Sequence, residues 1–161
     1  MTTNPATRGF LGGLRAGHRA LLGAYGREVA FPVDALIFEE GKPADRFWIL
    51  RTGSVDLDPA TPVPGPGHGP DAVEILGPGE LLGWSWLFAP YTWHLTARAA
   101  SPVRALEFDA ARVRALCDED HEFGHALTHA VAEVVGRRLR ASRSRLLDAG
   151  AVRTGAARAR T

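Results

Sequence analysis

The stretch Gly41-Lys-Pro-Ala-Asp-Arg-Phe-Trp-Ile-Leu-Arg-Thr-Gly-Ser-Val55 is the most informative segment of this sequence. Aromatic and aliphatic residues form a short apolar run from Phe47 to Leu50, and Gly41 and Gly53 flank that run. Such a run between turn glycines predicts a buried strand with a tight turn at each end. Glycine suits these corners because they require φ values that strain other residues.

Segments of the same kind extend on both sides of this stretch. Short apolar runs broken by glycine and proline predict seven or eight strands, among them 93–99 and 103–108. Residues 58–71 hold five prolines and three glycines, which predicts a loop. The fold class we predict is mainly β with flanking helices, an antiparallel β-roll of the jelly-roll kind. Its expected parts are a helical lead-in, the β-roll, C-terminal helices and a disordered tail, at 1–26, 27–108, 109–149 and 150–161.

The region after the predicted β-roll has helical periodicity. Asp109 is a good N-cap for a helix over 110–116, and a longer helix should run from about Glu119 to Asp148, with Gly150 as its stop. Apolar residues fall on one stripe of the longer helix: Phe123, Leu127, Val131, Val134, Val135, Leu139, Leu146 and Leu147. The stripe is longer than a roll of this size should cover. We therefore expect it to form a homodimer, or to bind a partner protein.

Composition restricts the function further. The chain has 161 residues, 45% hydrophobic and 23% charged, with a formal net charge of +1. Its one cysteine, Cys117, excludes an intrachain disulfide and an iron–sulfur cluster held by several thiolates. The sequence lacks an apolar run of about 20 residues and a secretory signal pattern. We expect a cytoplasmic protein that has no membrane partner and no cofactor.

Two further segments, 76–83 and 96–108, complete a family pattern with the stretch quoted above. Together they resemble the cyclic nucleotide-binding domain of Crp/Fnr-type regulators and of cyclic nucleotide-gated proteins. The resemblance implies a cradle in which an arginine and backbone amides at a helix N-terminus hold the cyclic phosphate, while a glutamate binds the ribose. It also implies a long C-terminal helix that closes on the base and often forms a dimer.

Both charged anchors of this cradle are replaced by tryptophan. Aligned through Gly83, the glutamate position falls on Trp84. Counted back from Thr96-Ala97-Arg98-Ala99, the arginine position falls on Trp93. Loss of one partner of a buried charged pair costs about 2–5 kcal/mol, so usual binding of cyclic AMP is not expected. The candidate ligand-binding residues, carried over by the resemblance, are Gly83, Trp84, Ser85, Trp86, Trp93, His94, Leu95 and Thr96.

Two interpretations of the tryptophans remain open. Trp84, Trp86 and Trp93 are either core aromatics that fill a retired pocket, or the walls of a site for an apolar or planar ligand. In the second case Tyr91 and His94 would supply polar contacts. Alternation along a regular strand would place Trp93 and His94 on opposite faces, which limits what His94 can contribute beside Trp93.

His121-Glu122-Phe123-Gly124-His125 matches the H-E-x-x-H pattern of zinc hydrolases, and His129 extends the same helix face. Gly124 weakens a helix there, and a protease would need a further subdomain for its substrate. We interpret the segment as a solvated face with incidental histidines, which would bind zinc or nickel only incidentally. No catalytic or metal-binding residue is assigned, and we expect that the protein is not an enzyme.

These patterns together predict a regulatory or sensory module in signal transduction. It would couple occupancy of the cradle by a small molecule to the position of the long helix. A ligand-free structural or docking subunit is the alternative, followed by a zinc hydrolase. A helix-turn-helix domain needs roughly sixty residues and only a short tail follows Asp148, so no sequence-specific DNA binding is expected.

Overall fold

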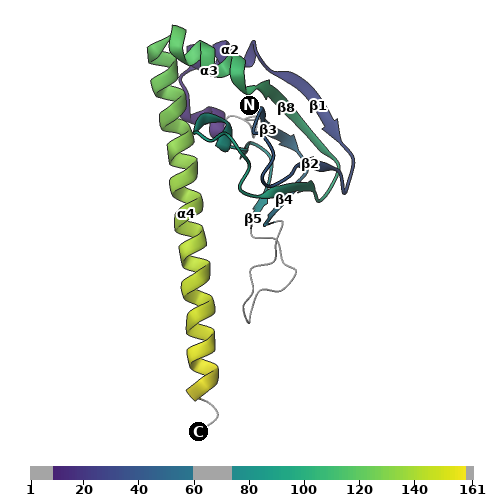
Figure 1. Cartoon of the computed structure of the whole chain (residues 1–161), viewed down its shortest axis with the longest axis vertical. Helices are drawn as coiled ribbons and strands as arrows, with labels where there is room; N and C mark the ends of the chain where they lie inside the picture. The colour runs from purple at the N-terminus through teal and green to yellow at the C-terminus, as the bar shows by residue number, and fades with distance from the viewer. Residues whose placement is uncertain (1–8, 60–73, 159–161) are drawn as a thin grey trace, which may run out of the picture.

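The computed structural model describes residues 9–59 and 74–158 of the chain. Most of the predicted proline-rich loop therefore lies outside the described residues. Eight strands occur in the described part: β1 (Arg27–Phe31), β2 (Leu36–Phe38), β3 (Arg46–Thr52), β4 (Val55–Asp58), β5 (Glu74–Leu76), β6 (Leu81–Leu82), β7 (Thr96–Ala99) and β8 (Val103–Asp109). They confirm a mainly β fold with flanking helices (Figure 1).

The strands form two antiparallel four-stranded sheets, ordered β1-β8-β3-β6 and β2-β7-β4-β5. The quoted stretch supplies β3, whose apolar run from Phe47 to Leu50 is buried at 0–4% exposure. Strand β3 lies between β8 and β6 in its sheet, so both of its edges are paired. Successive side chains point to opposite faces, and Phe47 stacks on Trp86 while Trp48 stacks on Phe38, so both faces meet apolar neighbours. This arrangement explains why the apolar run is continuous rather than alternating.

The turn glycines behave largely as predicted. Gly41, Gly53 and Gly79 have positive φ, whereas Gly77 does not, so the expectation was wrong at Gly77. Gly53 is the clearest case, because its φ is +86° and a Cβ atom would lie 2.2 Å from the carbonyl oxygen of Pro102. No side chain fits between these two backbone segments.

Helical elements precede and follow the roll. The lead-in holds a 3-10 turn, η1 (Phe10–Gly13), and a short helix, α2 (Ala16–Gly23). Helix α3 (Ala110–Glu119) begins at Asp109, whose side chain accepts a hydrogen bond from the amide of Arg112 at 3.0 Å and confirms the predicted N-cap. Helix α3 outlasts its predicted end by three residues. None of the helices in the described ranges is long and apolar enough to cross a membrane.

Helix α4 (His121–Arg158) runs along one side of the roll and then extends past it (Figure 1). The predicted stop at Gly150 was wrong, and nine residues of the predicted tail, 150–158, are helical. A single glycine costs a helix about 1 kcal/mol, and the alanines that follow favour its continuation. Residues 159–161 of that tail lie outside the described residues.

The apolar stripe of α4 divides into two parts. Phe123, Leu127, Val131 and Val134 are buried at 0–5% exposure, so this part packs on the rest of the chain. Leu139, Leu146 and Leu147 are 60–71% exposed. Gly124, which weakens the helix in isolation, permits a close approach to α3, because a Cβ atom there would lie 2.7 Å from the carbonyl oxygen of Cys117.

Candidate functional site

The candidate site residues lie in two segments of the roll, 83–86 and 93–96. The first leaves β6 at Gly83 and passes through the 3-10 turn η2 (Ser85–Leu87). The second runs from Trp93 into β7. Gly83 has a φ of +90°, and a Cβ atom on it would lie 2.7 Å from Cη2 of Trp93. The two segments are therefore in direct contact, and we call the region between them the cradle.

Trp93 occupies the interior of the cradle and is only 4% exposed. Its ring stacks on Phe38 of β2, with centroids 3.9 Å apart and planes 14° apart. Its backbone amide donates to Lys42 O at 3.0 Å, and its carbonyl accepts from the amide of Gly41 at 2.9 Å. Trp93 is thus fixed by its ring and by its backbone. The Gly41–Lys42 turn, at the start of the segment from Gly41 to Val55, therefore holds the backbone of Trp93.

Trp86 is completely buried beside Trp93's segment. It stacks on Phe47 of β3 at 4.1 Å, and its indole Nε1 donates to the carbonyl of Gly83 at 3.2 Å. Arg114 of α3 donates to the carbonyl of Trp86 at 2.7 Å and lies over the ring of Tyr91 at 4.5 Å. The turn η2 is therefore held by the core on one side and by α3 on the other. Sequence reasoning missed Arg114, because nothing in its spacing marks a contact to η2.

Trp84 and His94 lie at the outer edge of the cradle. Trp84 is half-buried and His94 is exposed, and their ring centroids are 5.3 Å apart. The ring of Phe88, 42% exposed, lies edge-on to the ring of Trp84, with centroids 6.2 Å apart. Aromatic and imidazole rings therefore gather at this edge, while the interior of the cradle is filled.

The remaining candidate residues, Ser85, Leu95 and Thr96, are buried or half-buried in the fold. Ser85 is buried, Leu95 is half-buried, and the hydroxyl of Thr96 accepts a hydrogen bond from the amide of Glu40 at 3.1 Å. The predicted strand from 93 to 99 was too long, because β7 begins only at Thr96. Trp93 pairs with the Gly41–Lys42 turn instead, so strand alternation does not determine how Trp93 and His94 are oriented.

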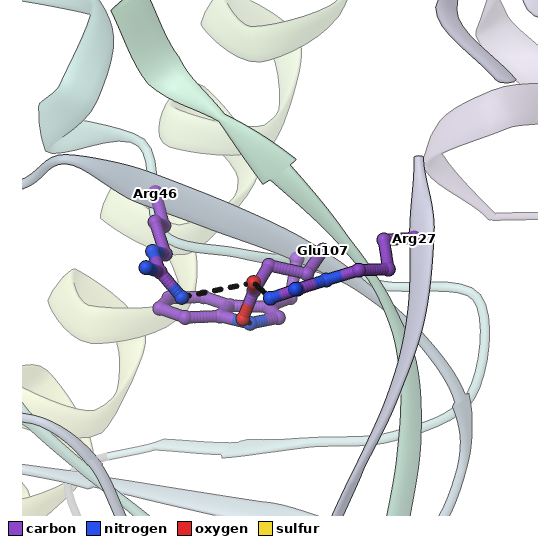
Figure 2. A network of polar contacts seen from close by, with 4 residues as sticks. Arg27, Arg46 and Glu107 are labelled. Atoms are coloured by element: carbon purple, nitrogen blue, oxygen red, sulfur yellow. Dashed lines mark hydrogen bonds and ion pairs between the residues drawn. The ribbon is translucent and has the colours of Figure 1, made fainter. Parts of the chain in front are cut away.

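A polar network lies behind the aromatic cluster. Glu107 of β8 is 8% exposed, and one of its carboxylate oxygens accepts from Trp48 Nε1 at 3.0 Å. Figure 2 shows Glu107 between Arg27 and Arg46, whose guanidinium groups approach it at 2.5 and 3.0 Å. Trp48 also stacks on Phe38, at 5.8 Å. All three partners of Glu107 are donors, so its charge is satisfied inside the fold.

The H-E-x-x-H segment lies on the outer surface of α4. His121, His125 and His129 are exposed, and Glu122 forms an ion pair with Arg15 instead of pointing at a metal. Among the residues whose side chains the structure describes, no group of three or more histidine, cysteine, aspartate or glutamate side chains is placed to hold a metal ion. This geometry favours the interpretation as a solvated face.

Comparison with known proteins gives consistent matches. The family model described as "Cyclic nucleotide-binding domain" matches residues 28–120. The "CRP-like cAMP-activated global transcriptional regulator" of Mycobacterium tuberculosis is 27% identical over 143 residues. That match covers 89% of this chain and 60% of the regulator, so the chain spans well under two thirds of its relative's length.

Solved structures agree with these matches. A putative cyclic nucleotide-binding protein from Geobacter metallireducens superimposes with a TM-score of 0.70 at 28% identity, covering 86% of this chain and 99% of that one. The N-terminal domain of a transcriptional regulator from Streptomyces coelicolor gives a TM-score of 0.62 at 28% identity, covering 89% and 92% of the two chains.

Proposed function

Because this chain belongs to the cyclic nucleotide-binding domain family, we propose that it is a regulatory module that does not hold a cyclic nucleotide in the family's usual way. The resemblance to Crp/Fnr-type regulators supports a role in signal transduction. The filled cradle supports the claim that a cyclic nucleotide is not held in the family's usual way. We infer that the protein works in the cytoplasm.

The observation that carries the proposal is the placement of Trp93. The family's phosphate-binding arginine aligns with this residue, whose ring is buried and lies directly against Gly83. A phosphate in this position would meet an indole instead of a guanidinium. It would therefore lose its charge-assisted hydrogen bonds, and the ring would already occupy its volume. Trp84, at the glutamate position, offers no carboxylate to a ribose.

Calorimetric titration with cyclic AMP and cyclic GMP tests this proposal. We expect no saturable heat at micromolar protein with the natural chain. The double variant Trp84→Glu/Trp93→Arg restores both charges, and we expect it to gain affinity for cyclic AMP. The matched control is Phe88→Glu, which adds a carboxylate next to Trp84 but outside the two anchor positions. A micromolar isotherm with the natural chain would contradict the proposal.

Helix α4 is the output element of the proposed module, because it would transmit the state of the roll to a second copy or to a partner protein. Its part beyond Val134 exposes Leu139 and Leu146, which are seven residues apart and therefore on one face. We infer that this face forms a homodimer, with binding of another protein as the second choice. Light scattering coupled to size exclusion should give a dimer for the natural chain and a monomer for Leu139→Asp/Leu146→Asp. The equally exposed Ile75→Asp on β5 should stay dimeric. A natural chain that is monomeric at high concentration would contradict the homodimer.

A ligand-free docking subunit is a second candidate, favoured by the same tight stacking of Trp93 and Trp86. The ring cluster of Trp84, Phe88 and His94 instead favours an aromatic-lined edge for an apolar ligand. Native mass spectrometry of the purified protein separates these two candidates. A co-purifying small molecule is expected for the aromatic-lined edge and not for the ligand-free docking subunit. The absence of sequence-specific DNA binding and of enzymatic activity stays a prediction.

A further inference from the structure

Two adjoining cavities lie where α4 meets the roll, away from the cradle. They have volumes of about 230 and 270 Å³, and they share Phe10 of η1 together with Val134 and Arg137 of α4. The first is also lined by Leu81, Glu74 and Arg138, so it borders the start of β6, the start of β5 and the helix. We call this first space the junction cavity. Its lining combines apolar side chains with two arginines and two glutamates, so it offers both apolar contact and charge to a small molecule.

Arg138 is the charged group that connects the helix to the roll. Its Nε lies 3.2 Å from a carboxylate oxygen of Glu74, and its Nη2 donates to the carbonyl of Leu81. The two side chains are only 14% and 19% exposed. Burial raises the pKa of Glu74 and lowers the pKa of Arg138, while the attraction between the two groups opposes both changes. Desolvation therefore offsets much of what this ion pair contributes.

Arg137 lines both cavities but has no counter-charge of its own. It forms no ion pair and no hydrogen bond within the part of the chain that the structure describes. Its charge also disfavours the neighbouring charge on Arg138. The other carboxylates here have polar partners, since Glu80 accepts from the amide of Gly77 at 2.6 Å and Glu133 lies 3.7 Å from His129. An anion near the two guanidinium groups would relieve their mutual repulsion.

We propose that the junction cavity binds a small organic monocarboxylate with an apolar body. The carboxylate would lie against Arg137 and Arg138, whose planar guanidinium groups suit a two-oxygen acceptor. The apolar body would lie against Phe10, Leu81 and Val134. A single negative charge fits better than two, because Glu74 and Glu80 line the same space.

Binding in this cavity has a consequence for α4. The bound carboxylate would compete with Glu74 for Arg138 and loosen the ion pair that joins the helix to β5. The next residue, Leu139, is already 60% exposed, so Arg138 lies at the boundary between the docked and the projecting parts of the helix. This consequence rests on the proposed role of α4 as the output element, whereas the binding itself does not.

The test uses benzoate as the probe and the full chain throughout. Calorimetry should show saturable binding of benzoate and none of benzamide, its neutral isostere. Arg137→Gln and Arg138→Gln should each weaken benzoate binding about ten-fold or more, whereas Arg140→Gln, the same change on an exposed side chain of α4 outside the cavity, should leave it unchanged. Arg137 is exposed, so its variant is expected to fold even if Arg138→Gln does not.

Three results would overturn the site. They are no saturable binding of benzoate, equal binding of benzamide and benzoate, or an Arg137→Gln variant that binds benzoate as tightly as the natural chain does. A second arm tests the link to α4 by electron–electron distance measurement between spin labels at Thr52→Cys and Ser144→Cys, in a Cys117→Ser background diluted with unlabelled chain. A benzoate-dependent change in that distance supports the link. Saturable binding with an unchanged distance overturns the link to the proposed output, while the site itself stands.

Discussion

The cradle and the junction cavity differ in what fills them. In the cradle, Trp93 and Trp86 stack on Phe38 and Phe47 at 3.9 and 4.1 Å, and both tryptophans are almost fully buried. At the junction, two arginines and two glutamates line a space of about 230 Å³ together with apolar side chains. The cradle is therefore packed like a protein core, while charge and empty volume lie beside the helix.

We infer that these two regions have different roles. A packed aromatic cluster stabilises the roll and keeps its shape, but it leaves no charged group for a phosphate. The polar junction borders empty space, and desolvation offsets much of what its ion pair contributes. We infer that the cradle now contributes stability and that the junction is the better place for regulation.

Trp86→Ala should cost the most stability. Removing a fully buried aromatic side chain typically lowers the free energy of unfolding by about 3–5 kcal/mol, and Trp86 is 0% exposed. Urea unfolding followed by circular dichroism measures the loss. Phe88→Ala is the control, because that ring is 42% exposed and should cost far less. Equal costs for the two variants would mean that the cradle is not packed as described.

Gly83→Ala and Gly41→Ala form a matched pair for the contact with Trp93. Both glycines have positive φ, +90° and +82°, so each alanine should cost about 1–2 kcal/mol from backbone strain. Only at Gly83 does the new Cβ atom meet the Trp93 ring, whereas at Gly41 no atom lies within 4 Å. Overpacking typically adds about 1–3 kcal/mol at Gly83. If the two variants unfold at the same urea concentration, Trp93 does not lie against Gly83.

The ion pair at the junction should affect how stability depends on pH, by less than the two substitutions above change the free energy of unfolding. Because burial raises the pKa of Glu74 in the folded chain, the folded state holds this proton more tightly than the unfolded state does. Stability from this group therefore increases as the pH falls from the folded pKa towards the unfolded one. Glu74→Gln should flatten the melting temperature against pH in this window just above the ordinary glutamate pKa. An unchanged profile would show that Glu74 is not desolvated, and the exposed Glu39→Gln serves as control.

The fold was largely predictable because its signals are local. Turn glycines at 41 and 53, an apolar run between them and an N-cap at Asp109 each determine structure within a few residues, and the structure confirms them. The end of α4 was not predictable in the same way. A glycine ends a helix only when the chain beyond it favours another conformation, and the alanine-containing segment after Gly150 does not.

The site was predictable only in part. The family resemblance predicted that the two anchor positions fall on Trp84 and Trp93, but long-range packing decides whether these tryptophans fill or line a pocket. The contacts of Trp93 with Phe38 and with the Gly41–Lys42 turn join residues about fifty positions apart. The ion pair between Arg138 and Glu74 joins two elements that no sequence pattern connects. Such pairs follow from the tertiary fold and not from spacing.

The indole N–H resonances of the four tryptophans give the most direct test of a filled cradle. Nitrogen-15 spectra recorded during a titration with cyclic AMP report separately on Trp48, Trp84, Trp86 and Trp93. We predict that the Trp86 and Trp93 resonances stay in place up to millimolar cyclic AMP, because both side chains are already enclosed by protein. A saturable shift of the Trp93 resonance would contradict the account, since it would place the nucleotide where the indole now lies.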